Sequence, residues 1–298
     1  MSELKPQGLK KSQILLYGFF GMFLNTFYLM FLAYNRLFYL TNVLQLSTQI
    51  SAVVNTLSVW GNVVTMLLAG AIIEKFTFKS GKFRTWTIIG GIVVGIAFTL
   101  LFANFGLSQG VAGALFVVMF VIQSIGYNTL WVAERSLVGP MSTTAADANS
   151  LAMVAQQGST LGGLIYGVVN PFIMKAVGDN YTWTALVYGL FIVLGTLGMF
   201  SLTRNFDSGS EPVVAAQKKE QVKGGFLKAM TGPTLPFFFA MILNNMHLGF
   251  FMTLLAYFTQ YVLQDPVILS TAVTAGSVAG LIGAWLSKII CDKMGKKR

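Results

Sequence analysis

A stripe of uncharged polar side chains runs along the apolar segment Gln49–Ile73. Its members lie three or four residues apart, so a helix places them on one face, and they are Asn55, Ser58, Asn62 and Thr65. Amide groups both donate and accept hydrogen bonds, which suits them to the hydroxyl groups of a sugar. The spacing therefore indicates a helix face that binds polar groups rather than lipid.

A second stripe, in the apolar segment Val111–Leu137, adds aromatic rings to the amides. It consists of Gln123, Tyr127, Trp131 and Arg135, with Asn128 and Glu134 beside it. Flat rings stack on the C–H faces of a sugar, while neighbouring amides bind its hydroxyl groups. We predict a shared polar cavity whose solute-binding residues are Asn25, Tyr28, Asn62, Tyr127, Asn128, Trp131, Gln157 and Asn245.

The same residues have a simpler interpretation, which stays open for each of them. Asn, Gln, Ser and Thr side chains also join helices inside a membrane by hydrogen bonds. Stripes on several helices favour a cavity over isolated helix contacts.

His247 is the single histidine, and it either packs as a neutral side chain or handles a proton.

The elements that carry these stripes are long apolar segments. Of the 298 residues, 55% are hydrophobic and 10% are charged, whereas a soluble domain carries about 25% charged residues. A hydrocarbon core of about 30 Å is crossed by roughly 20 helical residues. Eight segments reach this length: Ile14–Leu40, Gln49–Ile73, Thr85–Asn104, Val111–Leu137, Leu151–Val177, Trp183–Leu202, Pro233–Leu263 and Ser270–Ile290. The sequence therefore predicts an all-α, polytopic membrane helical bundle.

The titratable residues do not form the constellation of an enzyme. The apolar segments contain no nucleophile–base pair and no metal-ligand spacing, so we expect neither catalysis nor a bound metal or cofactor. Cys291 is the single cysteine, which excludes an intramolecular disulfide. The expected partners are membrane lipid and a small-molecule solute, carbohydrate in class, and not nucleic acid. The sequence does not indicate an oligomeric state.

Basic residues gather on one side of the predicted spans. Most of the 20 Lys and Arg residues lie in the N-terminal segment, after the second and sixth spans, and at the C-terminal end. Cytoplasmic loops carry such an excess, so we expect both termini in the cytoplasm and a location in the plasma membrane. This pattern accounts for the net charge of +10 without a nucleic-acid partner.

A polar linker divides the chain. Residues 203–228 are rich in Gly, Ser, Pro and charge. We assign residues 1–202 to an N-terminal six-helix half, 203–228 to a cytoplasmic linker, and 229–298 to the first two helices of a second half. An acidic residue followed by a Gly-led basic cluster occurs after the second and the eighth spans, which indicates an internal repeat. Duplicated halves are typical of transporters, and on this interpretation about four helices of the second half are missing.

The loop after the second span carries a family motif. Its sequence Gly81-Lys82-Phe83-Arg84-Thr85-Trp86, together with the second basic cluster, resembles the major facilitator superfamily. Within it, the chain resembles the melibiose-permease-like glycoside–pentoside–hexuronide:cation symporter family. Tyr17-Gly18-Phe19 and Ser136-Leu137-Val138 support this resemblance. It implies a twelve-helix, major-facilitator-type transporter, with about eight helices present in a C-terminally truncated chain, that carries a sugar or glycoside by alternating access.

The resemblance also implies a site for a coupling cation, Na⁺ or H⁺, and an inner gate. The family's cation-binding aspartates match Gly61 and Thr65 here, so we expect a degenerate site with weak or absent sodium coupling. A proton-coupled cycle would need a titratable group, and the candidates are His247 and Glu134. The gate would pair charged residues of the loop with the end of the fourth span, namely Glu74, Lys82, Arg84, Glu134 and Arg135.

Two other functions stay open. The uncharged stripes also fit a lipid or lysolipid carrier of the same fold, which binding of a zwitterionic headgroup would distinguish. The missing helices and missing carboxylates also fit a truncated product without transport activity.

Overall fold

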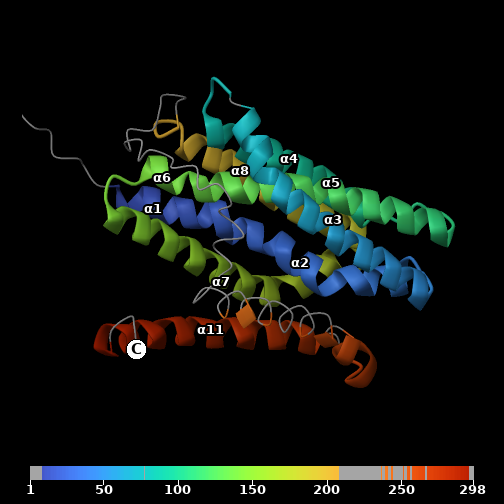
Figure 1. Ribbon diagram of the computed structural model, residues 1–298. Coiled ribbons are helices and arrows are strands. Elements are labelled where there is room, and N and C mark those ends of the chain that lie inside the picture. The colour runs from blue at the N-terminus through green and yellow to red at the C-terminus, as the bar shows by residue number, and fades with distance from the viewer. Residues whose placement is uncertain are drawn as a thin grey trace, which may run out of the picture.

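The computed structural model describes residues 9–76, 78–207, 236, 239, 240, 243, 251, 254, 255, 257–265 and 267–294. Within these ranges every regular element is a helix (Figure 1). In chain order they are α1 (Lys11–Gly18), η1 (Phe19–Phe23), α2 (Leu24–Phe38), η2 (Tyr39–Val43), α3 (Thr48–Lys75), α4 (Lys82–Leu101), α5 (Gln109–Ser136), α6 (Val138–Met141), α7 (Ala145–Ala176), α8 (Tyr181–Leu202), η4 (Phe258–Val262) and α11 (Val267–Met294). The elements labelled η are single π-helical turns.

The six spans predicted before the linker coincide with these helices, to within two turns at their ends. The first helical segment, Lys11–Val43, is continuous and consists of α1, η1, α2 and η2. Within the part of the chain that the structure describes, five helical segments are long and apolar enough to cross a membrane: Lys11–Val43, Thr48–Lys75, Lys82–Leu101, Gln109–Met141 and Tyr181–Leu202. The predicted helical membrane bundle is therefore confirmed. The eighth predicted span lies within α11, whereas most of the seventh lies outside the described residues.

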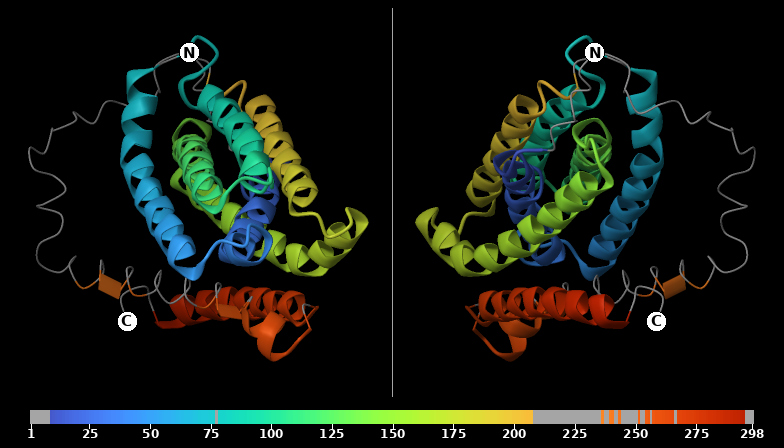
Figure 2. Two further views of the ribbon diagram at one scale, coloured as in Figure 1. Left: turned by 90° about the vertical axis from the view of Figure 1, so that its right-hand side faces the viewer. Right: turned by 90° about the vertical axis from the view of Figure 1, so that its left-hand side faces the viewer.

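The long helices pack side by side (Figure 1). α5 contacts both α3 and α4, α4 packs on α8, and α2 contacts α7 and α8. α11 lies against α7 on the outside of the bundle, as both views in Figure 2 show. This arrangement brings α2, α3 and α5, which carry most of the predicted solute-binding residues, into one part of the bundle.

Aromatic rings fill the centre where α2, α4 and α8 meet. Phe31 on α2 is fully buried. Its ring centroid lies 6.0 Å from that of Phe98 on α4 and 5.4 Å from that of Tyr188 on α8. Tyr28, one turn earlier on α2, meets Phe98 edge to face at 4.7 Å. These separations are typical of favourable aromatic pairs, and they hold α2 in a defined rotation about its axis.

Glycines allow two pairs of helices to approach closely. A Cβ atom on Gly90 of α4 would lie 2.6 Å from the carbonyl oxygen of Gly126 on α5. A Cβ atom on Gly162 of α7 would lie 2.7 Å from the carbonyl oxygen of Phe23 in η1. Small residues at membrane helix contacts have this role, and both contacts fix the helices that position the polar stripes.

Candidate functional site

Two residues of the first predicted stripe, Asn62 and Thr65 on α3, contact Asn128 on α5, which flanks the second stripe. Asn128 Nδ2 on α5 donates hydrogen bonds to Asn62 Oδ1 at 3.1 Å and to Thr65 Oγ1 at 2.9 Å on α3. Thr65 Oγ1 in turn donates to the Asn62 carbonyl oxygen at 2.9 Å. Thr65 is buried, and the two amides are half-buried. This cluster joins the helices, as the simpler interpretation expects, and it places two of the predicted solute-binding amides together.

Gly61, one of the two positions matched to family aspartates, faces α5. A Cβ atom there would lie 2.6 Å from Val121 Cγ2. Thr65, the other position, is the acceptor of the Asn128 hydrogen bond. The oxygen atoms at this contact are therefore neutral carbonyl, amide and hydroxyl groups, and a longer acidic side chain at Gly61 would displace Val121.

The aromatic residues of the predicted site come together between α2 and α5. The Tyr28 hydroxyl donates a hydrogen bond to Gln123 Oε1 on α5, and its ring centroid lies 5.4 Å from that of Tyr127. Tyr28 and Gln123 are buried, whereas Tyr127 is half-buried. Tyr28 therefore packs against Tyr127, and of these two side chains Tyr127 is the one that is partly exposed.

Trp131, one turn after Tyr127 on α5, presents its ring at the surface of the six-helix part. The side chain is 40% exposed. The Arg135 guanidinium carbon lies 5.4 Å from the centre of the ring, and Arg135 Nη2 lies 3.7 Å from Met22 Sδ. An exposed indole beside a cation, about one turn along α5 from the Asn128 amide, is a surface on which a polyhydroxylated ring can stack.

Asn25 and Glu134 form a pair that the sequence did not predict. Asn25 Nδ2 on α2 donates to both carboxylate oxygens of Glu134 on α5, at 3.2 and 3.3 Å. Asn25 and Glu134 are each 3% exposed. Both had been assigned separately, Asn25 to the solute site and Glu134 to the inner gate, because the sequence does not fix which helix faces meet.

The loop residues of the predicted inner gate lie elsewhere. Arg84 is buried and its guanidinium carbon lies 3.9 Å from the centre of the Phe200 ring. Glu74 is exposed and Lys82 is half-buried. Within the described residues, no ion pair of 4.0 Å or less joins these three side chains to Glu134 or Arg135. The gate therefore stays a prediction for another state of the protein.

The other two predicted solute-binding residues are not part of this cluster. Gln157 is exposed on α7. Asn245, like His247, lies outside the described residues. The structure thus brings Tyr28, Asn62, Tyr127, Asn128 and Trp131 into one region, and it does not bring Gln157 to them.

A cavity that the sequence did not predict opens at the other end of α3. Its volume is about 590 Å³, and it is lined by Leu37, Thr41, Asn42, Thr48, Ser51, Ala52, Asn55, Thr56, Tyr257 and Tyr261. The Tyr257 hydroxyl lies 2.8 Å from Thr41 Oγ1, and the Tyr261 hydroxyl donates to Asn42 Oδ1. Asn55 belongs to the first stripe, which was the one sequence signal for this cavity. Tyr257 and Tyr261 lie 216 positions after Thr41 and 219 positions after Asn42, respectively, so their meeting with these residues was not predictable from the sequence.

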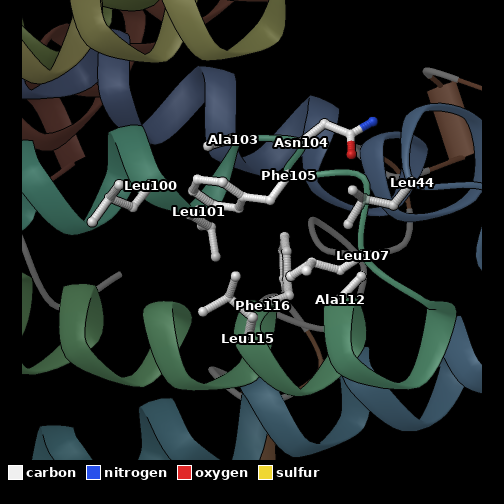
Figure 3. Close-up of a pocket in the computed structure, with 10 residues that line it drawn as sticks. All are labelled: Leu44, Leu100, Leu101, Ala103, Asn104, Phe105, Leu107, Ala112, Leu115 and Phe116. Carbon is white, nitrogen blue, oxygen red and sulfur yellow. The ribbon is translucent and has the colours of Figure 1, made fainter.

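A second pocket is too small and too apolar to hold a solute. It lies between the loop 102–108 and the start of α5, and has a volume of about 10 Å³ (Figure 3). Its walls are mainly leucine and phenylalanine side chains, among them Leu101, Phe105 and Phe116. That space is about the size of one water molecule.

Comparison with known proteins adds to this geometry. The sequence matches the profile of a family described as "MFS/sugar transport protein" over residues 12–298. It is 26% identical over 249 residues to the raffinose carrier protein of Pediococcus pentosaceus. The aligned region covers 76% of this chain and 37% of that protein. It is 23% identical over 252 residues to the lactose permease of Lactobacillus delbrueckii subsp. bulgaricus. The aligned region covers 80% of this chain and 40% of that protein.

A third relative is named for a different solute. The chain is 28% identical over 228 residues to an Escherichia coli protein named "Putative 2,3-dihydroxypropane-1-sulfonate exporter". That match covers 73% of this chain and 48% of the relative. The matches to these three curated relatives thus span less than half of each relative's length.

Proposed function

The chain belongs to the MFS/sugar transport protein family, and we propose that it acts in the transport of a sugar, glycoside or related small polar solute across the membrane. In this proposal the solute crosses by alternating access, in which one helical half rocks against another around a central site. The long match to the family supports the fold of such a carrier, and the neutral polar and aromatic cluster supports the class of solute.

The observation that carries the proposal is the exposed Trp131 ring, about one turn along α5 from Tyr127 and from Asn128, which pairs with Asn62. The ring is 40% exposed in a part of the bundle where the neighbouring aromatic residue Tyr28 is buried. Tyr127 lies one turn away on the same helix, and Asn128 links α5 to α3. Stacking faces and neutral amides together suit a ring that carries many hydroxyl groups.

The proposed site therefore consists of Tyr28, Asn62, Tyr127, Asn128 and Trp131. The cavity beside Asn55 and Tyr257 is a second polar space toward the opposite end of α3, large enough for a disaccharide-sized molecule to enter. We propose that it is the mouth through which solute approaches from that side. The placement of basic residues supports a plasma-membrane protein with both termini in the cytoplasm. In that topology the start of α3 faces the outside, so the cavity of about 590 Å³ would be the outward-facing mouth.

Solute binding to the purified protein tests this function. Isothermal titration calorimetry in detergent micelles, with raffinose and lactose as probes and lysophosphatidylcholine as the competing class, gives a direct readout. Saturable binding of a sugar supports the proposal. Saturable binding of the lysolipid with no response to either sugar would replace it with a lipid carrier of the same fold.

A further inference from the structure

Glu134 is a carboxyl group enclosed between helices. It lies on α5, two residues before the end of that helix, and is 3% exposed. Its Cδ atom lies 3.9 Å from the position that a Cβ atom would take on Gly21, and Met199 Sδ of α8 lies 3.6 Å from the same position. The carboxyl group therefore lies close to the glycine backbone of η1 and is enclosed away from water.

The carboxylate has a neutral amide as its hydrogen-bond partner and, within the described residues, no ion-pair partner at 4.0 Å or less. Asn25 Nδ2 lies 3.2 and 3.3 Å from its two oxygens. Within the described residues, no Lys, Arg or His nitrogen forms an ion pair with it at 4.0 Å or less. The adjacent Arg135 directs its guanidinium to Trp131 and Met22 instead. A charge that is buried without a counter-charge in a membrane protein is costly, and such a group commonly takes up a proton.

The geometry fits a proton better than a metal cation. The Gly21 carbonyl oxygen lies 2.7 Å from Asn25 Nδ2, so that nitrogen already occupies the point where this oxygen and the two carboxylate oxygens converge. A hard metal cation binds through about six oxygen ligands, which are not gathered here. A proton needs one oxygen and no additional space.

Asn25 has an atom suited to each protonation state of its partner. Its Oδ1 atom is buried and has no hydrogen-bond partner within the described residues. A carboxylate only accepts hydrogen bonds, whereas a protonated carboxyl group also donates one. Rotation of the Asn25 amide would let Oδ1 accept from protonated Glu134, just as Nδ2 now donates to the carboxylate.

We propose that Glu134 binds and releases a proton during the transport cycle, with Asn25 as its positioning residue. This inference rests on the proposed function, since the proton is taken to be coupled to solute movement. The physical connection is short, because Trp131 precedes Glu134 by less than one turn on α5 and Arg135 contacts the Trp131 ring. A change of charge on Glu134 acts on Arg135 and, through it, on the proposed stacking surface.

The other titratable groups around the carboxyl group are not carboxylic acids. They are Tyr17 on α1, whose hydroxyl donates to the Glu134 carbonyl oxygen at 2.9 Å, and Tyr127 and Arg135 on α5. η1 and α2 present Gly21 and Asn25 to it, and α8 presents Met199, none of which titrates. Tyrosine and arginine side chains have no carboxyl C=O group, so among these neighbouring side chains a carboxyl band belongs to Glu134.

Infrared difference spectroscopy of the purified protein tests the proposal without requiring transport. As the pH is raised stepwise, we expect the C=O stretching band of a protonated carboxyl group to disappear. Glu134→Gln should remove this band, and Glu134→Asp should retain a carboxyl band. Asp179→Asn is the matched control, because Asp179 is exposed at a positive φ of 55° that asparagine adopts readily. This control should keep the band.

The positioning role of Asn25 has its own readout. Asn25→Ala removes the donor to the carboxylate, so the band should persist to higher pH than in the unaltered protein. An unchanged band in Asn25→Ala would assign Asn25 a structural role alone and overturn that part of the proposal. A band that is absent from the unaltered protein, or that survives in Glu134→Gln, would overturn the proton site itself.

Calorimetry of solute binding at several pH values separates this inference from the proposed function. We expect the affinity to depend on pH in the unaltered protein and to lose that dependence in Glu134→Gln. Sugar binding that is independent of pH, without the infrared band, would leave the carrier function standing and reject the proton site. The band without any sugar binding would retain the proton site and reject the carrier function.

Discussion

The carboxylate of Asp207 accepts a hydrogen bond of 2.8 Å from the backbone N–H of Arg84, although the two residues are 123 positions apart. The same carboxylate accepts hydrogen bonds from the backbone N–H groups of Lys82 at 3.1 Å and Phe83 at 2.6 Å. The first N–H groups of a helix have no partner within the helix. Asp207, just beyond the end of α8, therefore caps α4 and links the loop motif to the segment that follows α8.

The first prediction concerns the strength of this cap. Asp207→Ala should lower the free energy of unfolding by about 0.5–2 kcal/mol, because the N–H groups at the start of α4 lose their acceptor. Asp207→Asn keeps one side-chain oxygen and should give a smaller loss. The measurement is unfolding by sodium dodecyl sulfate in micelles, followed by circular dichroism. Equal stability of Asp207→Ala and the unaltered protein would contradict the role of the cap.

The second prediction tests the stacking surface. Trp131→Ala should weaken sugar binding by about 1–3 kcal/mol, the range found for aromatic platforms elsewhere. Trp183→Ala is the matched control. Trp183 is 58% exposed, and it lies at the start of α8, a helix that carries neither stripe. Gln157→Ala, also at an exposed position, should leave the affinity unchanged. Sugar affinity that survives Trp131→Ala would place the site elsewhere.

The third prediction is that sodium leaves the affinity for solute nearly unchanged. Gly61 has no side chain and faces Val121, while Thr65 Oγ1 is already the acceptor of the Asn128 amide at 2.9 Å. Neutral oxygens alone hold a monovalent cation weakly compared with carboxylates. The test is calorimetry of solute binding over a sodium titration at fixed ionic strength, with choline as the replacement cation. A large rise in affinity with sodium would show that these oxygens suffice.

The fourth prediction concerns topology. Ser80 lies between α3 and α4, and Ser108 lies between α4 and α5, so the 20-residue helix α4 separates them. In a protein with Cys291 replaced by alanine, a cysteine at Ser80 should react only with reagent on the cytoplasmic side. A cysteine at Ser108 should react only from the outside. Both positions are exposed, which makes each a fair reporter. Reversed labelling at either position would contradict the assignment from basic residues.

Periodicity predicted the helices well, because hydrophobic length and polar spacing are properties of one segment at a time. Asn62 and Thr65 on α3 do contact α5, through Asn128, whereas Tyr127 on α5 contacts Tyr28 on α2. The partner of each side chain was not predictable, because it depends on how each helix is rotated against its neighbours. Asn25 was thus assigned to solute although it bonds Glu134, and Asp207 was assigned to a linker although it caps α4.

The last prediction separates residues that join helices from residues that bind solute. Asn128 and Asn55 belong to the same polar pattern, yet their surroundings differ. Asn128 Nδ2 donates to Asn62 Oδ1 and Thr65 Oγ1, whereas Asn55 Oδ1 is buried and without a hydrogen-bond partner within the described residues. An unpaired buried acceptor contributes nothing favourable to the fold, and replacing it with an apolar group of similar shape costs little stability.

Asn128→Leu should therefore lower the free energy of unfolding by about 0.6–1.7 kcal/mol, the range measured for hydrogen bonds between membrane helices. Asn55→Leu should change stability by less than about 0.5 kcal/mol, since no bond is lost. Because Asn55 lines the cavity of about 590 Å³ beside Tyr257 and Tyr261, its replacement should instead slow solute entry or weaken binding. Unfolding and calorimetry on the same two variants give both quantities. If Asn55→Leu lost stability and kept full solute affinity, Asn55 would join helices as Asn128 does, and the cavity would lose its proposed role as the mouth of the site.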